Sequence, residues 1–372
     1  MNMNRTVKSI LALTFVLAIA GATPGLVAQE YTIKFATLAP EGTTWMNLMK
    51  QYDQAIRQES GGRLGFKIYA GGVQGDEKDV LRKMRNGQLH AAGVTGNGIS
   101  DIAPKVRILD SPFLFRNYAE VDNIYAKFDQ EFQQSFQDGG YVLLGWAEVG
   151  FVNVFTNSPV KKPADMNSVK MWLWEGDPVA EASFKALGIH PIPLSIADVL
   201  TSLQTRLIDG VYTSPYACIA LQWFTHVKYM MDMPLADASG AVIVSKKKFD
   251  EMPKDLQDIL LRNGKKYMAQ LTQASRDDNQ KSIATLKQKG MTMVSIPSTD
   301  APVYEETGRK ARQIMAAGKL SEKGLNPDFV ARVENAVQEF RKAPAAPKPE
   351  VKPETKKEVK PKPKTKSGGK KK

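Results

Sequence analysis

Short apolar runs alternate with longer amphipathic segments from about residue 30 onward. The runs TIKFATL, LGFKIYA and LHAAGVTG are typical of short strands, because their apolar residues alternate or stay continuous over only a few positions. The segments between them place apolar residues at helical spacing, and the first ends at Ser60-Gly61-Gly62. This β-α-β-α-β order predicts a parallel sheet with helices on both faces.

The same alternation returns after Tyr141 with different lengths. The run YVLLGWAEVGFVNVFTN is long for one strand and is suited to crossing between two lobes. From Lys254, helical spacing continues over about 36 residues, which would extend about 54 Å as one helix. A helix of that length can brace two lobes. We therefore expect an α/β fold of two lobes with hinge strands and a long bracing helix.

The N-terminal segment has the pattern of a secretory signal peptide. Arg5 and Lys8 precede an uncharged apolar run over residues 10–20, and small residues offer cleavage after Ala22 or Ala28. The run is too short for a comfortable membrane span, which needs about 20 residues. Residues 1–28 are therefore predicted to direct export to the periplasm, with an uncleaved anchor as the alternative.

Lys and Pro dominate the C-terminal segment, residues 343–372, which is predicted to be disordered. Its 11 Lys and 3 Glu carry a net charge of +8, and the two bases of the signal segment add +2. Only +2 of the net charge of +12 therefore belongs to the remainder, which argues against a nucleic-acid partner. We expect the tail to contact anionic envelope components, or to serve only as a solvated spacer.

Catalytic and metal-binding chemistry has little support in the sequence. Cys218 is the single cysteine and lies in an apolar context, which predicts a small buried side chain rather than a disulfide or a nucleophile. The three His residues are far apart, and no G-x-S-x-G motif is present. We therefore expect no metal, no cofactor and no enzymatic activity. An exported hydrolase and an envelope-attachment protein are the alternatives from other classes.

Two α/β lobes, an export signal and no catalytic cluster fit a periplasmic binding protein. In such folds a small-molecule solute lies between the lobes, at the carboxyl ends of the strands. We expect lobe I to comprise residues 30–148 and about 235–265. Lobe II is expected to comprise residues 149–234 and about 266–342.

Several stretches resemble, in order, the solute-binding proteins of TRAP transporters, the DctP-type family. They include SGGRLGFKIYAGGVQGDEKDVLRKMRNGQLHAA, LDSPFLFRNY, FTNSPVKKPADMNSVKMW and FKALGIHPIPLSIADVLTSLQTRLIDG. The resemblance implies a receptor that closes around a small solute, usually a carboxylate, and delivers it to a TRAP membrane permease. It spans about residues 33–296 and excludes both terminal segments.

The chain departs from the family pattern where relatives hold a carboxylate. The resemblance places the family's anchoring Arg at the end of an L-K-I-R strand, and that stretch here ends in Trp172. A second family Arg, in a G-x-R stretch, corresponds to Val152. Because Arg holds carboxylates in a bidentate manner, its loss predicts an apolar, aromatic or weakly charged ligand. A carboxylate receptor that uses other contacts is the alternative.

An apolar site would also suit the branch of the family that works with a periplasmic TPR protein.

Further candidate residues follow strands or share the strand face of Trp172. Trp174 is expected either to pack in the core or to line the site. Thr43, which precedes the candidates Thr44 and Trp45, is expected to cap a helix. The remaining candidates are Tyr212, Ser214, Thr95, Trp174, Thr44 and Trp45.

Overall fold

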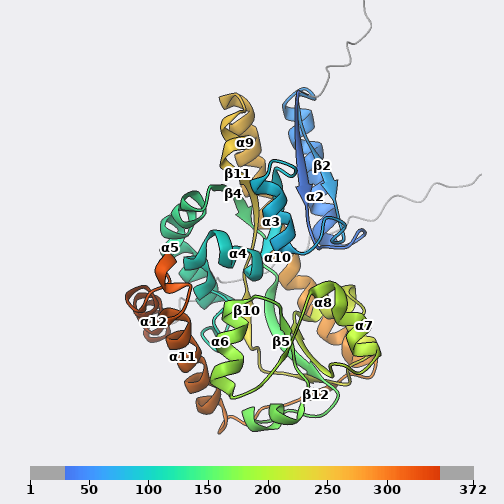
Figure 1. The fold of residues 1–372 in the computed structure, drawn as a ribbon, viewed down its shortest axis with the longest axis vertical. Helices are drawn as coiled ribbons and strands as arrows, with labels where there is room; N and C mark the ends of the chain where they lie inside the picture. Colours follow the sequence, from blue (N-terminus) through green and yellow to red (C-terminus); the bar gives the residue numbers. More distant parts are fainter. Residues whose placement is uncertain (1–29, 344–372) are drawn as a thin grey trace, which may run out of the picture.

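Two β-sheets organise the computed structural model, which describes residues 30–343 (Figure 1). The expected signal segment and the tail beyond residue 343 lie outside the described residues. The first sheet has the strand order β2-β1-β3-β11-β4. Its strands are β1 (Tyr31–Ala36), β2 (Leu64–Tyr69), β3 (Ala91–Thr95), β4 (Tyr141–Trp146) and β11 (Gly240–Ser245).

Strand β1 pairs in parallel with β2 and β3, as the β-α-β-α-β pattern predicted, and β11 joins antiparallel to β3 and β4. Along β11, Val242 and Val244 face one apolar cluster, while Ala241 and Ile243 face another. Because both faces are buried, helices cover the sheet on both sides. These helices include α2 (Thr44–Glu59), α3 (Glu77–Arg85), α4 (Gly96–Ile102), α5 (Tyr118–Asp138) and α9 (Lys246–Asp250).

The second sheet has the order β10-β5-β9-β12, with β8 paired to β5, and the short strands β6 and β7 pair beside it. Its helices are α6, α7 and α8, each of which follows one of these strands in the chain. The strands are β5 (Gly150–Thr156), β6 (Trp172–Trp174), β7 (Ile192–Leu194), β8 (Gly210–Thr213), β9 (Tyr229–Met231), β10 (Ala236–Ala238) and β12 (Thr292–Val294). The helices are α6 (Pro178–Leu187), α7 (Val199–Gln204) and α8 (Pro215–Ala220).

The long apolar run after Tyr141 forms two strands separated by residues 147–149. Strand β4 belongs to the first sheet and β5 to the second, so the run crosses between the lobes as its length predicted. The chain crosses back from β10 to β11, with Ser239 between them. Two neighbouring crossings of this kind allow the lobes to rotate about a hinge.

Helix α10 (Lys254–Gln288) is 35 residues long and confirms the predicted bracing helix. It packs on α2 and β4 of the first lobe and on α8 and β5 of the second. Gly264 allows its close approach to β4, because a Cβ there would lie 2.4 Å from the carbonyl oxygen of Leu144. The helix therefore lies directly against the hinge region.

The C-terminal helices differ from the expected lobe boundaries. Helix α11 (Ala301–Ala317) packs on α6, but α12 (Pro327–Lys342) packs on α5 of the first lobe. The Phe329 ring lies 5.6 Å from the Phe128 ring, and the apolar face of α12 joins the first-lobe core. The expected assignment of the whole segment 266–342 to lobe II therefore does not hold for α12.

Candidate ligand-binding site

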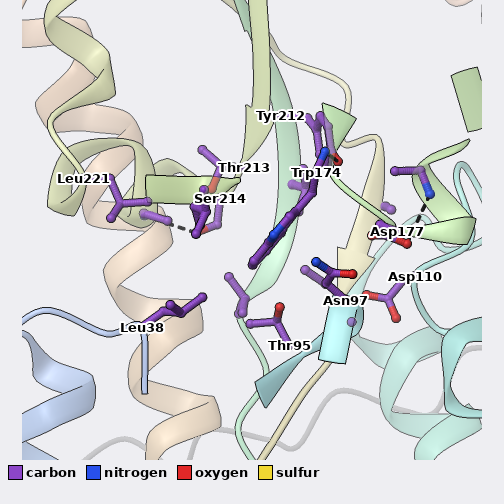
Figure 2. Close-up of a pocket in the computed structure, with 18 of the residues that line it drawn as sticks. Leu38, Thr95, Asn97, Asp110, Trp174, Asp177, Tyr212, Thr213, Ser214 and Leu221 are labelled. Carbon is purple, nitrogen blue, oxygen red and sulfur yellow. Dashed lines mark hydrogen bonds between the residues drawn. The ribbon is translucent and has the colours of Figure 1, made fainter. Parts of the chain in front are cut away.

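A cavity of about 270 Å³ lies between the two sheets, and residues of both lobes line it (Figure 2). Its walls come from the ends of β1, β3 and β8 with the first turns of the helices that follow them, and from β5, β6 and β10. Most of the lining surface is apolar. All eight residues predicted for the site line this cavity: Trp172, Val152, Tyr212, Ser214, Thr95, Trp174, Thr44 and Trp45.

The two tryptophans of β6 occupy different depths of the wall. Trp172 is 2% exposed, its ring stacks on Tyr212 with centroids 5.0 Å apart, and its indole N–H donates to the Leu194 carbonyl at 3.0 Å. Trp174 is half-buried, and its ring projects into the cavity in Figure 2. The sequence had favoured Trp172 for the site and left Trp174 open. The structure places Trp174 at the cavity surface and Trp172 in the packing behind it.

Val152 gives the crossing strand an apolar face at the cavity. It is buried and pairs with Ala236 across β5 and β10, and both side chains belong to the lining. In antiparallel strands, directly paired residues point to the same side of the sheet. The position that the resemblance assigns to a family Arg is therefore part of a small apolar surface.

The first turns of two helices meet at another part of the wall. The backbone N–H of Thr44 donates to the Tyr216 hydroxyl at 3.2 Å, which links α2 of the first lobe to α8 of the second. Ser214 caps α8 by accepting the Ala217 N–H at 3.2 Å. Its hydroxyl thus has a structural partner inside the protein. Thr43 caps α2 by accepting the Met46 N–H, as expected.

Trp45 and Thr95 come from the first lobe. The Trp45 ring stacks on Phe35 with centroids 6.1 Å apart and covers Gly93, where a Cβ would lie 2.6 Å from the ring. The buried hydroxyl of Thr95 lies beside the Glu77 carboxylate, to which it can donate, and its oxygen accepts no hydrogen bond from the described residues. Thr95 therefore offers a polar atom to a ligand, whereas Trp45 offers an apolar edge.

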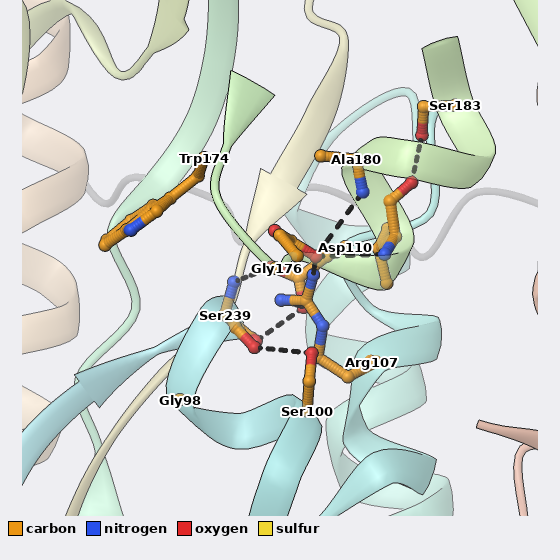
Figure 3. A network of polar contacts seen from close by, with 12 residues as sticks. Gly98, Ser100, Arg107, Asp110, Trp174, Gly176, Ala180, Ser183 and Ser239 are labelled. Atoms are coloured by element: carbon orange, nitrogen blue, oxygen red, sulfur yellow. Dashed lines mark hydrogen bonds and ion pairs between the residues drawn. The ribbon is translucent and has the colours of Figure 1, made fainter. Parts of the chain in front are cut away.

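A buried ion cluster that the sequence analysis did not identify lies at one end of the cavity (Figure 3). Arg107, 2% exposed, donates to Asp177 at 2.6 Å and lies 3.2 Å from Asp110. Asp110 also accepts the backbone N–H and the hydroxyl of Ser239. The only sequence signal was the Arg-x-x-Asp spacing directly before the PFLFR motif.

This cluster depends on a glycine and joins the two lobes. A Cβ on Gly96 would lie 1.4 Å from a terminal nitrogen of Arg107, so only glycine leaves room for the guanidinium. Burial alone would lower the pKa of Arg107, but the charges of Asp110 and Asp177 hold this pKa above its ordinary value. Because Asp177 caps α6 of the second lobe, the charged guanidinium bridges the cleft.

Further contacts cross the cleft near Trp174. Asp76 caps α3, and its carboxylate also accepts the Trp174 indole N–H at 3.1 Å and the Ser195 hydroxyl at 3.0 Å. The ammonium of Lys78 donates to the Gly176 carbonyl at 2.7 Å. The lobes are therefore closed on each other through polar contacts beside the cavity.

Acidic groups outnumber basic groups in the described lining. Arg107 is its one basic side chain, against five acidic ones. Burial raises the pKa of Glu77 to about 7, although its carboxylate accepts the Thr95 and Gly98 N–H groups. The acidic side chains are Glu77, Asp110, Asp177, Asp237 and Asp278.

Replacing Asp237 by asparagine is expected to stabilise the fold at neutral pH by about 1–3 kcal/mol. Asp237 is fully buried, and neither carboxyl oxygen has a partner in the described part of the chain. Burial, with the nearby charges of Glu148 and Asp110, raises the pKa of Asp237 well above its ordinary value. The folded state thus keeps a proton that the unfolded chain releases above about pH 4, so this group lowers stability as pH rises.

Chemical denaturation at pH 4 and pH 7.5 tests this expectation. The gain from Asp237→Asn should be present at pH 7.5 and nearly vanish at pH 4. Asp258→Asn, at an exposed position on α10, is the matched control and should change stability little at either pH. An equal gain at both pH values would contradict the assignment.

Within residues 30–343, no helix is both long and apolar enough to cross a bilayer. The same residues contain no group of three or more acidic, His or Cys side chains arranged to hold a metal ion. Cys218 is fully buried in the second-lobe core, which agrees with its predicted packing role.

The closed two-lobe fold and its interlobe cavity define a solute-binding receptor. Residues 35–317 match the family described as bacterial extracellular solute-binding protein, family 7 (DctP), and the chain belongs to this family. The family's description is that of solute-binding proteins rather than enzymes.

Relatives and solved structures agree with this membership. The chain is 26% identical to the 2,3-diketo-L-gulonate-binding periplasmic protein YiaO of Escherichia coli, over 76% of this chain and 88% of that protein. A TRAP solute-binding protein from Pseudomonas putida F1 with bound D-glucuronate has a TM-score of 0.74 at 21% identity, over 85% and 98% of the two chains. One from Desulfovibrio salexigens with bound orotic acid has a TM-score of 0.76 at 16% identity, over 83% and 99%. The two structures support the predicted two-lobe fold.

Proposed function

We propose that this protein is a periplasmic receptor that captures a small, mainly apolar or aromatic solute and delivers it to a TRAP membrane permease. The solute would bind in the interlobe cavity against Trp174, with Trp172 and Tyr212 behind it. Closure of the lobes requires that the solute bind the closed form more tightly than the open form. The polar contacts of Asp76 and Lys78 across the cleft support such a closed form.

The proposed ligand class rests on Arg107, the one basic side chain in the described lining, because this side chain is already paired with carboxylates of the protein. Both terminal nitrogens of Arg107 face carboxylates of the protein, at 2.6 Å from Asp177 and 3.2 Å from Asp110. The positions of the two family arginines hold Trp172 and Val152. A carboxylate entering this cavity would lose its hydration without gaining an unpaired cation, which is costly.

The relatives named above favour a second candidate, a carboxylate receptor with different contacts. The ligands in their descriptions, 2,3-diketo-L-gulonate, D-glucuronate and orotic acid, are carboxylates. For this chain, such a ligand would have to use Arg107 Nε, which has no partner in the described residues. A single buried N–H is a weak substitute for the bidentate fork of a free Arg.

Thermal unfolding in the presence of candidate solutes separates the two ligand classes. We expect saturable stabilisation by aromatic or acyl compounds, because binding to the folded state raises its stability by mass action. At a concentration of about 100 times Kd, the gain is about 2.7 kcal/mol. Succinate, sialic acid and 2-oxoacids should give no saturable shift. Strong stabilisation by a simple dicarboxylate would overturn the apolar assignment.

We propose further that residues 1–28 direct the chain to the periplasm, that the Lys-rich tail contacts anionic envelope components, and that a periplasmic TPR protein receives the solute. An apolar solute supports the last point, because it gains from direct transfer between proteins. Co-purification from the native host tests the TPR partner. Deletion of residues 343–372 followed by an envelope-retention assay tests the tail.

A further inference from the structure

We infer that the solute carries a protonated nitrogen, such as a primary amine, bound at the end of the cavity formed by Asn97, Asp110 and Asp177. This inference rests on the proposed receptor function and specifies the polar end of its ligand. Figure 2 shows these three side chains gathered on one side of the Trp174 ring. The aromatic or aliphatic body of the solute would lie against that ring.

Asn97 supplies an acceptor that the protein leaves unused. Its side chain is 2% exposed, it lines the cavity, and its Oδ1 has no hydrogen-bond partner among residues 30–343. A buried amide oxygen without a donor costs free energy, so such groups normally have a partner. The Thr95 hydroxyl, two residues earlier, is also buried and lies beside the Glu77 carboxylate, to which it can donate. Both oxygens can accept a hydrogen bond from an N–H group.

The charge at this end of the cavity is complementary to a cation. Asp110 and Asp177 are two carboxylates, and Arg107 between them is a single guanidinium with both terminal nitrogens occupied. By formal charge the three groups sum to −1, which the Ser239 hydrogen bonds to Asp110 and the N-terminus of α6 at Asp177 offset in part. A ligand ammonium would supply the missing positive charge, whereas a ligand carboxylate would add a third negative group.

The remaining charges of the lining act in the same direction. The described lining contains no Lys or His, and its other acidic groups are Asp278, Glu77 and Asp237. The raised pKa values of Glu77 and Asp237 reduce the negative charge that these two carboxyls carry at neutral pH. An acidic lining without Lys or His attracts cations and repels anions. An ammonium gains additionally from the face of Trp174, because aromatic rings attract cations.

Three compounds with one aromatic body and different heads test the inference on the full chain. They are 2-phenylethylamine, 2-phenylethanol and 3-phenylpropanoate, which end in an ammonium, a hydroxyl and a carboxylate. Titration calorimetry at pH 7 should show saturable binding of the amine. We expect the amine to bind about tenfold more tightly than the alcohol, a difference in affinity that corresponds to one charge-assisted hydrogen bond. The difference in affinity between the amine and the carboxylate should be larger still.

Variants of Asn97 and Thr95 test where the ammonium group of the ligand binds. Asn97→Ala should weaken binding of 2-phenylethylamine about tenfold and leave binding of 2-phenylethanol less affected. Thr95→Val, which keeps the side-chain shape, provides a second readout if Asn97→Ala does not fold. Asn335→Ala, at an exposed position on α12, is the matched control and should change neither affinity.

The outcomes separate this inference from the function on which it rests. Equal or tighter binding of the alcohol or the carboxylate would overturn the ammonium head and leave the receptor function intact. Lack of saturable amine binding at millimolar concentration would also overturn it. The receptor function itself fails only if protein from the native host retains no solute of any class.

Discussion

Replacing Arg107 by methionine is expected to lower the free energy of unfolding by about 3–5 kcal/mol. The substitution keeps an unbranched side chain but leaves Asp110 and Asp177 buried with no compensating charge. It also removes the ionic contact between the two lobes, so closure should be impaired together with stability. Equilibrium denaturation in urea, followed by circular dichroism, measures the change.

Arg116→Met is the matched control for this loss. Arg116 forms an ion pair with Glu305, but the two side chains are 59% and 46% exposed, so removal should cost less than about 1 kcal/mol. Arg107→Lys should recover part of the lost stability, because lysine restores the positive charge but not the planar guanidinium that contacts both carboxylates. Similar stability of the Arg107→Met and Arg116→Met variants would contradict the role assigned to the buried cluster.

Replacing Trp174 by alanine is expected to weaken solute binding by about 30- to 100-fold, which corresponds to about 2–3 kcal/mol. The variant loses the aromatic wall of the cavity and the indole N–H that donates to Asp76 across the cleft. Both losses disfavour the closed, solute-bound form. The measurement is titration calorimetry with the compound that stabilises the protein most in the thermal panel.

Trp174→Phe separates the two contributions. Phenylalanine keeps most of the aromatic surface but cannot donate to Asp76, so the loss should be several-fold, about one hydrogen bond. An affinity of Trp174→Ala within twofold of the unchanged protein would show that the solute lies elsewhere. Stability of each variant without solute provides the control for misfolding.

Local pattern was sufficient to predict most of the fold. The strands around Tyr31 and Tyr141 and the long helix from Lys254 have periodicities that do not depend on distant contacts. The lobe boundary at α12 was not predictable in this way. The amphipathic pattern of α12 shows that one face is buried, but does not show that Phe128 of α5 is the residue it contacts.

The same limit applies to the site. The eight candidate residues came from strand ends and from family resemblance, and the structure places all of them on one cavity. Their depths could not be predicted, because Trp172 and Trp174 share a strand face and differ only in what packs on them. Arg107 and Asn97 were missed, because ion pairs with Asp177 and unpartnered buried oxygens arise only from tertiary contacts.

Native mass spectrometry of the full chain purified from its own host tests the proposed ligand class most directly. The lining around Trp174, Trp172 and Val152 and the occupied Arg107 predict a retained solute with an apolar or aromatic body and no carboxylate. Fragmentation of the released solute should identify that body and a nitrogen-containing head. A retained C4-dicarboxylate or sugar acid would contradict the prediction.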